Sequence, residues 1–199
     1  MGNAVMVKTR PRERYTWPQP GEWTYEDYLR LPDDGKRYEI IWGVLYVTNA
    51  PNSLHQFTVL QIARRLSDFV EKGQRGIVLI APFEVHLPGI ARPVQPDLLF
   101  VAGDRLKLGD PYFEGAPDLV VEVLSPGTMR KDRTIKFDAY EAAGVREYWV
   151  ADPKTRSVEV YSLPEGGREY VLLGQFGSDE KARSEVLEGF QVAVDTLFA

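Results

Sequence analysis

The sequence predicts a mixed α/β domain, α+β in the looser sense of the term. Short runs of β-branched and aromatic residues, typical of strands, are interspersed with segments in which apolar residues recur at helical spacing. Strands come before, between and after the helices, as expected for a mixed architecture. With 199 residues, 44% of them hydrophobic, the chain can bury the core of one sizeable domain. We expect that domain over residues 21–199, after a Pro-rich arm over residues 1–20.

The first predicted elements are a short helix, a hairpin and a long helix. Thr24 is a suitable N-cap for the short helix, because acidic residues occupy the turn that follows it. Residues 37–47 are aromatic and β-branched with a glycine at the turn, which is the pattern of a β-hairpin. Asn52 or Ser53 can cap a long amphipathic helix over about 54–71.

The next elements form the predicted sheet. Strands near residues 76–87 and 95–101 flank a turn over 88–93 that is rich in proline and glycine. Residues 118–124 are a nearly continuous apolar run, which predicts a strand covered on both faces at the centre of the sheet. The remaining predicted elements are a helix over 132–143 with Gly144 as its C-cap, a strand over 147–151, and an outer hairpin from 157–163 and 169–174.

Composition narrows the chemistry that the chain can perform. It has no cysteine, which excludes disulfides, thiolate metal sites and a cysteine nucleophile, and its two histidines disfavour a His-rich zinc site. A metal would therefore be held mainly by carboxylates, which points to a hard cation such as Mg²⁺ or Mn²⁺. The net charge of −5 argues mildly against a protein that coats nucleic acid, but a local basic patch is enough to steer such a substrate.

No part of the sequence indicates contact with a membrane. Residues 1–14 are polar and basic, and no later stretch approaches the roughly 18 apolar residues of a membrane span. We therefore expect a cytoplasmic protein.

Two acidic residues and one lysine stand out as candidates for a catalytic site. Asp97 and Glu122 lie in otherwise apolar strands, where an unpartnered carboxylate costs several kcal/mol. Each also has a structural interpretation, Asp97 as a turn acceptor at a strand start and Glu122 as one half of a buried ion pair. Lys136 lies on the helix after the Glu122 strand, which brings it back over the strand end; the alternative is a solvated surface charge.

Several motifs together resemble a known family. They are Pro96-Asp97, the run PDLVVEVLSP at 117–126, Asp132, Lys136, Tyr140 and the run GVREYWVADP at 144–153. They resemble the putative restriction endonuclease family, first catalogued as a domain of unknown function and grouped with the PD-(D/E)XK nucleases. The resemblance covers roughly residues 20–198 and includes 38–43, the helix start near His55 and Gly189-Phe190.

The resemblance implies a restriction-endonuclease-like fold and a metal-dependent site. The fold would be a mixed central sheet flanked by helices, with an additional N-terminal β-hairpin region, in one PD-(D/E)XK nuclease-like domain over 21–199. Asp97 and Glu122 would bind the divalent ion, with the backbone carbonyl of Val123 as a further ligand. Leu124 stands where the wider superfamily places lysine, and in this family the role is thought to pass to a helix lysine, here Lys136.

Other charged residues are weaker candidates. By analogy, Glu39 is an additional ligand or base, and its alternative is a strand-edge ion pair. Basic residues next to the proposed metal can contact phosphates that flank the cut, or form only an exposed, salt-bridged helix start: Arg130, Lys131 and Arg133. Asp132 is explained as a helix cap. His55 is a hydrogen-bonding helix residue more often than a catalytic base.

The leading hypothesis is a Mg²⁺- or Mn²⁺-dependent endonuclease that hydrolyses DNA phosphodiester bonds, with Asp97 and Glu122 as ligands and Lys136 as the catalytic cation. The alternative is a catalytically inactive nuclease-fold protein that binds nucleic acid or a protein partner. A sugar hydrolase is a third hypothesis, which requires carboxyl groups about 5–10 Å apart and no metal. The aromatic segment over 15–23 and the outer hairpin suit subunit contacts, so we expect a homodimer or higher homo-oligomer.

Overall fold

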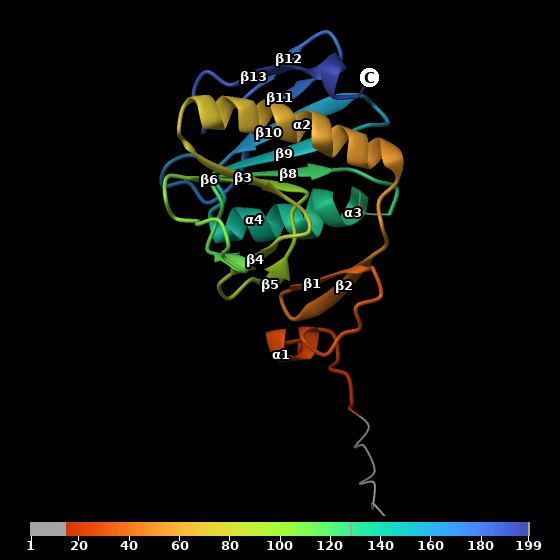
Figure 1. The fold of residues 1–199 in the computed structure, drawn as a ribbon. Coiled ribbons are helices and arrows are strands. Elements are labelled where there is room, and N and C mark those ends of the chain that lie inside the picture. Colours follow the sequence, from red (N-terminus) through yellow and green to blue (C-terminus); the bar gives the residue numbers. More distant parts are fainter. Residues whose placement is uncertain (1–14, 128, 199) are drawn as a thin grey trace, which may run out of the picture.

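The computed structural model describes residues 15–127 and 129–198, and these form two mixed sheets with helices against them (Figure 1). A six-stranded sheet, in the order β11-β10-β9-β8-β6-β3, has the long helix α2 (Ser53–Lys72) on one face. The other face packs on the helix α4 (Phe137–Ala143) and on a five-stranded sheet in the order β2-β1-β5-β4-β7. The predicted mixed α+β class is confirmed.

The six-stranded sheet contains the central strand that the apolar run predicts. Its members are β3 (Gly76–Ile80), β6 (Leu98–Ala102), β8 (Leu119–Val123), β9 (Glu147–Asp152), β10 (Ser157–Ser162) and β11 (Val171–Phe176). Every residue of β8 is buried, and this strand runs parallel to β9 and antiparallel to β6. Alternate side chains of β8 face α2 and α4. Glu122 therefore points to the α4 side, as Val120 does.

The five-stranded sheet corrects two predictions. Its members are β1 (Arg37–Ile41), β2 (Val44–Thr48), β4 (Glu84–Leu87), β5 (Ala91–Val94) and β7 (Tyr112–Glu114). The β1–β2 hairpin is confirmed, but the predicted strand over 76–87 is two strands of different sheets, interrupted before Pro82, which lacks a backbone N–H. The predicted turn over 88–93 contains the start of β5, and the short strand β7 has no counterpart among the predictions.

The N-terminal segment is attached to the hairpin turn. Helix α1 (Tyr25–Tyr28) begins after Thr24, whose side chain forms the predicted cap, and Asn52 caps α2. The backbone N–H groups of Gly21 and Trp23 both donate to the carbonyl of Gly43, at 2.7 and 3.0 Å. Of the predicted arm, residues 1–14 lie outside the described residues.

The predicted helix over 132–143 begins with a π-helical turn, which is wider than a turn of α-helix. It comprises α3 (Met129–Lys131), the π-helical turn η1 (Asp132–Lys136) and α4, and it ends at Gly144 in the left-handed conformation with φ 81°. Within η1, Asp132 and Lys136 are buried, whereas Arg133 between them is exposed. A π-turn re-aims side chains relative to a regular helix and is common at functional sites.

The C-terminal part adds a small sheet and a short helix. They are β12 (Lys181–Arg183), β13 (Gln191–Ala193) and the 3-10 helix η2 (Val194–Leu197). Leu197 and Val194 complete the core beside α2. Within the part of the chain that the structure describes, no helix combines the length and apolar character that crossing a bilayer requires.

Candidate active site

Strand register brings Asp97 and Glu122 together. In the antiparallel pairing of β6 and β8, Leu98 lies opposite Val121. The same register continued by one residue sets Asp97, just before β6, opposite Glu122. Directly opposed side chains have Cβ atoms about 5 Å apart. The two carboxylates are 3% and 1% exposed, so they share a buried site at the end of the sheet.

Three donors surround the carboxylate of Asp97. Arg37 Nη1 donates to Oδ1 at 3.0 Å, and both His55 Nε2 and the backbone N–H of Val123 lie 3.0 Å from Oδ2. Burial raises the pKa of Asp97, but the His55 contact and the Arg37 charge outweigh it and hold the pKa below its ordinary value. Asp97 is thus an anion at any physiological pH.

Glu122 has the opposite electrostatic character. Its Oε1 accepts hydrogen bonds from Lys136 Nζ and from the Tyr140 hydroxyl, each at 2.7 Å. Burial and, to a smaller extent, the nearby carboxylates Asp97 and Asp132 together raise the pKa of Glu122 to about 8, against the charge of Lys136. Two carboxylates with pKa values displaced in opposite directions are a pattern found at catalytic sites.

Lys136 and Lys131 join β1 to this site through Glu39. Lys136 Nζ lies 2.9 Å from Glu39 Oε1, and Lys131 Nζ lies 2.5 Å from Oε2 and 2.9 Å from the hydroxyl of Thr48. Burial raises the pKa of Glu39, but the charges of Lys136 and Lys131 outweigh it and lower the pKa to about 2. The carboxylates around Lys136 raise its pKa despite burial. Lys136 therefore remains cationic.

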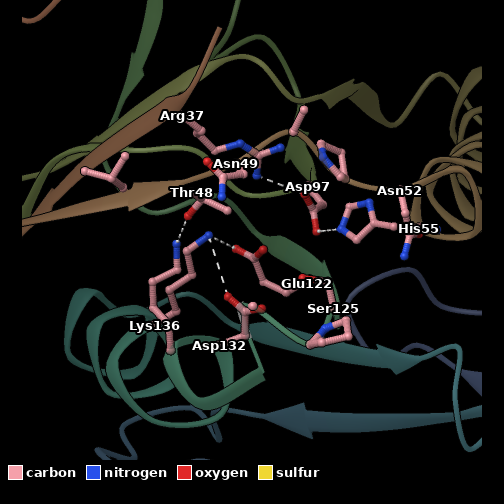
Figure 2. A pocket seen from close by; sticks show the side chains of 16 residues that line it. Arg37, Thr48, Asn49, Asn52, His55, Asp97, Glu122, Ser125, Asp132 and Lys136 are labelled. Atoms are coloured by element: carbon pink, nitrogen blue, oxygen red, sulfur yellow. Dashed lines mark hydrogen bonds and ion pairs between the residues drawn. The ribbon is translucent and has the colours of Figure 1, made fainter. Parts of the chain in front are cut away.

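These groups surround one cavity of about 300 Å³ between the hairpin β1–β2, the start of α2 and the turn η1. Figure 2 shows Asp97 between Arg37 and His55, with Glu122 and Asp132 beside the amine of Lys136. Acidic and basic side chains both line this cavity. They are Arg37, His55, Asp97, Glu122, Lys131, Asp132 and Lys136. The loop 49–52 and residues 125–127 form the rest of its wall.

The model of the Uma2 family, described as putative restriction endonuclease, matches residues 25–195. This chain belongs to that family. A putative nuclease from Anabaena variabilis ATCC 29413 has a similar solved structure, with a TM-score of 0.74 at 18% sequence identity, over 88% of this chain and 97% of that one. At this identity the likeness shows that the two proteins share a fold. No curated protein matches the sequence significantly.

The predicted site residues of this restriction endonuclease family member fall into two groups. Asp97, Glu122, Lys136 and Lys131 line the cavity, and Glu39 contacts both lysines behind it. The others lie outside the lining of the cavity: Val123 contributes its N–H to Asp97, Arg130 is exposed, and Arg133 is bound by Glu159 through two contacts of 2.8 and 2.9 Å. The structure thus groups the acidic candidates with Lys131 and Lys136, and it leaves Arg130 and Arg133 outside this group.

Three cavity residues were missed or given too little weight in the sequence. Asp132, interpreted only as a helix cap, is buried and lines the cavity. Arg37 is two residues before Glu39 on β1, so both side chains point to the same face of the strand, a period-2 signal that was available. His55 was interpreted mainly as a hydrogen-bonding helix residue, and its Nε2 contact to Asp97 joins residues 42 positions apart. No local pattern could have predicted that pairing.

The chemistry of the donor set fits a hard divalent cation held by few protein ligands. Asp97 and Glu122 present carboxylate oxygens to one cavity. Among residues 15–127 and 129–198, no three His, Cys, Asp or Glu side chains form a ready-made metal cluster. Mg²⁺ typically keeps several waters and uses only one or two carboxylates together with substrate phosphate. Two acidic ligands are therefore sufficient for Mg²⁺.

Proposed function

We propose that this protein is a Mg²⁺- or Mn²⁺-dependent endonuclease of the PD-(D/E)XK type that hydrolyses DNA phosphodiester bonds. The observation that carries the proposal is the grouping of Asp97, Glu122 and Lys136 around one cavity in a chain of the restriction endonuclease family. Two carboxylates and a permanent cation match the needs of phosphodiester hydrolysis, in which negative charge develops on the phosphate.

Asp97 and Glu122 would hold the divalent ion, with the carbonyl of Val123 as a further ligand. When bound, the ion supplies neutralisation of phosphate charge and a lower pKa for its bound water. Lys136 places a fixed positive charge beside the Glu122 carboxylate, where a phosphate oxygen would lie. Glu39 positions the amines of Lys136 and Lys131. Its two oxygens contact these amines and the backbone N–H of Gln95, and these contacts support a positioning role over that of a base.

Phosphates flanking the cut would meet the basic face of α3 and η1. Lys131 reaches the cavity, and the exposed Arg130 lies one residue before it. Arg133 is also on this segment, but Glu159 neutralises its guanidinium. We therefore expect Lys131 and Arg130 to contribute more to DNA binding than Arg133.

Binding without cleavage is the second candidate function. Its support is that each site carboxylate already has a cationic partner, Asp97 in Arg37 and Glu122 in Lys136. Glu122, whose raised pKa of about 8 favours the protonated form at neutral pH, must lose its proton before it can bind a metal. Position 124, where the superfamily places lysine, is a buried leucine.

A cleavage assay tests the proposal. Purified protein is incubated with supercoiled plasmid or single-stranded DNA in Mg²⁺, Mn²⁺ or EDTA, in parallel with Asp97→Asn. We expect metal-dependent cleavage that falls at least about 100-fold in the variant, as when a transition-state contact is lost. Glu71→Gln, which removes an exposed carboxylate of α2, is the matched control and retains the parent rate. Equal cleavage by Asp97→Asn would refute the site, and no cleavage by any protein favours the binding function.

We also propose that the protein is a homodimer. Large aromatic side chains are exposed on the N-terminal face, at 45% for Tyr15, 43% for Trp17 and 44% for Trp42. Such a patch suits contact between subunits. Light scattering should give twice the chain mass of 22.6 kDa, and a mass of 22.6 kDa would remove this proposal.

A further inference from the structure

A second cavity adjoins the candidate active site. Its volume is about 270 Å³, and it shares Asn52, His55, Ser125 and Pro126 with the first cavity. The residues that belong to it alone are Leu54, Leu124, Met129, Asp152, Pro153 and Lys154. The two cavities are therefore neighbouring compartments on either side of the His55 and Ser125–Pro126 wall.

The walls of this second cavity are mostly apolar. Leu54, in the first turn of α2, is 45% exposed, and Met129 is 36% exposed, although both could pack in a core. Lys154 is the single cation in the lining, and the carboxylate of Asp152 accepts the backbone N–H groups of Lys154 and Thr155. A phosphate needs several cations or N–H donors. This compartment suits an uncharged, flat group instead.

His55 adds one polar group to the second cavity. The side chain is 5% exposed, and its Nε2 lies 3.0 Å from the Asp97 carboxylate. The other ring nitrogen, Nδ1, is buried and has no hydrogen-bond partner within the described residues. A buried polar nitrogen without a partner is unfavourable, and the polar edge of a ligand would satisfy it.

We propose that the second cavity binds one unpaired nucleobase of the DNA strand that is cut. This inference rests on the proposed nuclease function, because the shared wall places the cavity beside the scissile phosphate. A nucleobase has two apolar faces for Leu54, Met129 and the prolines, and a polar edge that can form a hydrogen bond with His55 Nδ1. A base can enter only when it is unstacked, which costs least in single-stranded or locally opened DNA. Such DNA is the preferred substrate.

Two variants of α2 test the cavity. Leu54→Trp fills it from the first turn of the helix, and Leu60→Trp makes the same change at a 52% exposed position that lines neither cavity. Binding is measured in EDTA by fluorescence anisotropy with two labelled probes: a single-stranded 20-nucleotide DNA, and the same backbone built of abasic units. We expect the abasic probe to bind the parent about tenfold more weakly. Leu54→Trp should lose about tenfold for the base-carrying probe alone, and Leu60→Trp should match the parent.

The outcomes separate this inference from the proposed cleavage. Equal binding of the two probes by the parent, or parent-like binding by Leu54→Trp, overturns the nucleobase cavity even if the parent cuts plasmid DNA. Base-dependent binding that Leu54→Trp abolishes supports the cavity even if no DNA is cut. A duplex 20-mer that binds more tightly than the single strand also overturns the inference.

Discussion

Lys136 Nζ lies 2.7 Å from Glu122 Oε1 in the core, and both side chains are only about 1–2% exposed. The lysine lies on the π-helical turn and the glutamate on the central strand, so the pair joins the helix layer to the sheet. Glu39 on β1 binds the same amine at 2.9 Å. Three elements therefore meet at one nitrogen atom, and its charge is needed for stability as well as for the proposed chemistry.

Removing that amine should strongly destabilise the fold. Lys136→Met leaves Glu39 and Glu122 buried without their shared cation. At about pH 9, where Glu122 is ionised, we expect the free energy of unfolding to fall by about 3–5 kcal/mol, as measured by urea denaturation. The double variant with Glu122→Gln removes one of the unpaired charges and should recover part of this loss. Arg133→Ala, which breaks a partly exposed pair, should cost at most about 1 kcal/mol. Additive single and double effects would contradict the direct Lys136–Glu122 coupling.

The raised pKa of Glu122 should make stability fall with rising pH. Burial raises its pKa from 4.5 to about 8, so the folded state binds this proton more tightly than the unfolded state. This contribution to stability is complete below about pH 4.5 and is lost as pH rises to 8. In EDTA, the Tm of the parent should fall between pH 5 and 8 relative to Glu122→Gln. Parallel Tm curves would show that Glu122 has an ordinary pKa.

The same proton should compete with a metal ion. A carboxylic acid must ionise before it binds Mg²⁺, so binding is favoured as pH rises through about 8. We expect 10 mM Mg²⁺ to raise the Tm of the parent several degrees more at pH 8.5 than at pH 6. Glu122→Gln should show no such difference, and an equal effect of Mg²⁺ at both pH values would argue against Glu122 as a ligand.

Arg130 and Arg133 offer a matched pair for testing the DNA contacts. Arg130 is exposed, whereas Arg133 is paired with Glu159 through two contacts. Each phosphate contact contributes about 0.7–0.9 to the slope of log affinity against log salt. Arg130→Ala should reduce that slope by about this amount, and Arg133→Ala by less than half of it, in anisotropy titrations across salt concentrations. The reverse order would place the DNA on the Glu159 side of the helix.

Gly43 should be intolerant of any side chain. It has φ 69°, and a Cβ atom there would overlap the backbone carbonyl of Gly21. Gly43→Ala should therefore lower the free energy of unfolding by at least about 1 kcal/mol and the Tm by roughly 2–4 °C per kcal/mol. Gly177→Ala, where the new Cβ meets only ordinary contacts, should stay within about 0.5 kcal/mol of the parent. A neutral Gly43→Ala would mean that residues 21–23 leave the hairpin turn.

The sequence predicted well those elements whose signal is local. The apolar run predicted β8 as a central strand, and periodicity with an asparagine cap predicted α2 to within one residue at each end. The short strands β5 and β7 were missed because they form by pairing with strands that are distant in the chain. The proline–glycine-rich segment over 88–93, where β5 begins, also has no β signal of its own. The π-turn was missed for a related reason, since its width depends on what Lys136 contacts across the fold.

The site was predictable as a set of residue types but not as a network. A carboxylate in an apolar strand needs a partner, because burying an unpaired charge is unfavourable. Asp97 and Glu122 were identified on this basis. The identity of that partner depends on tertiary packing. Arg37 and His55 come from separate elements and reach Asp97 only when the hairpin and α2 close over the sheet end. Arg133 was grouped with its neighbours in sequence, although it is turned towards Glu159.

The separation of Lys136 from the Glu122 strand affects how proteins of this kind can be recognised. A search pattern that demands lysine two positions after the strand glutamate finds Leu124 here and rejects the chain. Each residue inserted or deleted before Lys136 turns its side chain by about 100° around the helix axis, so a variable sequence spacing must be matched by a compensating turn. Here Lys136 lies in the π-helical turn η1, which is wider than a regular helical turn. A spatial template of two opposed carboxylates and one amine, with no condition on their order in the sequence, would retrieve this chain.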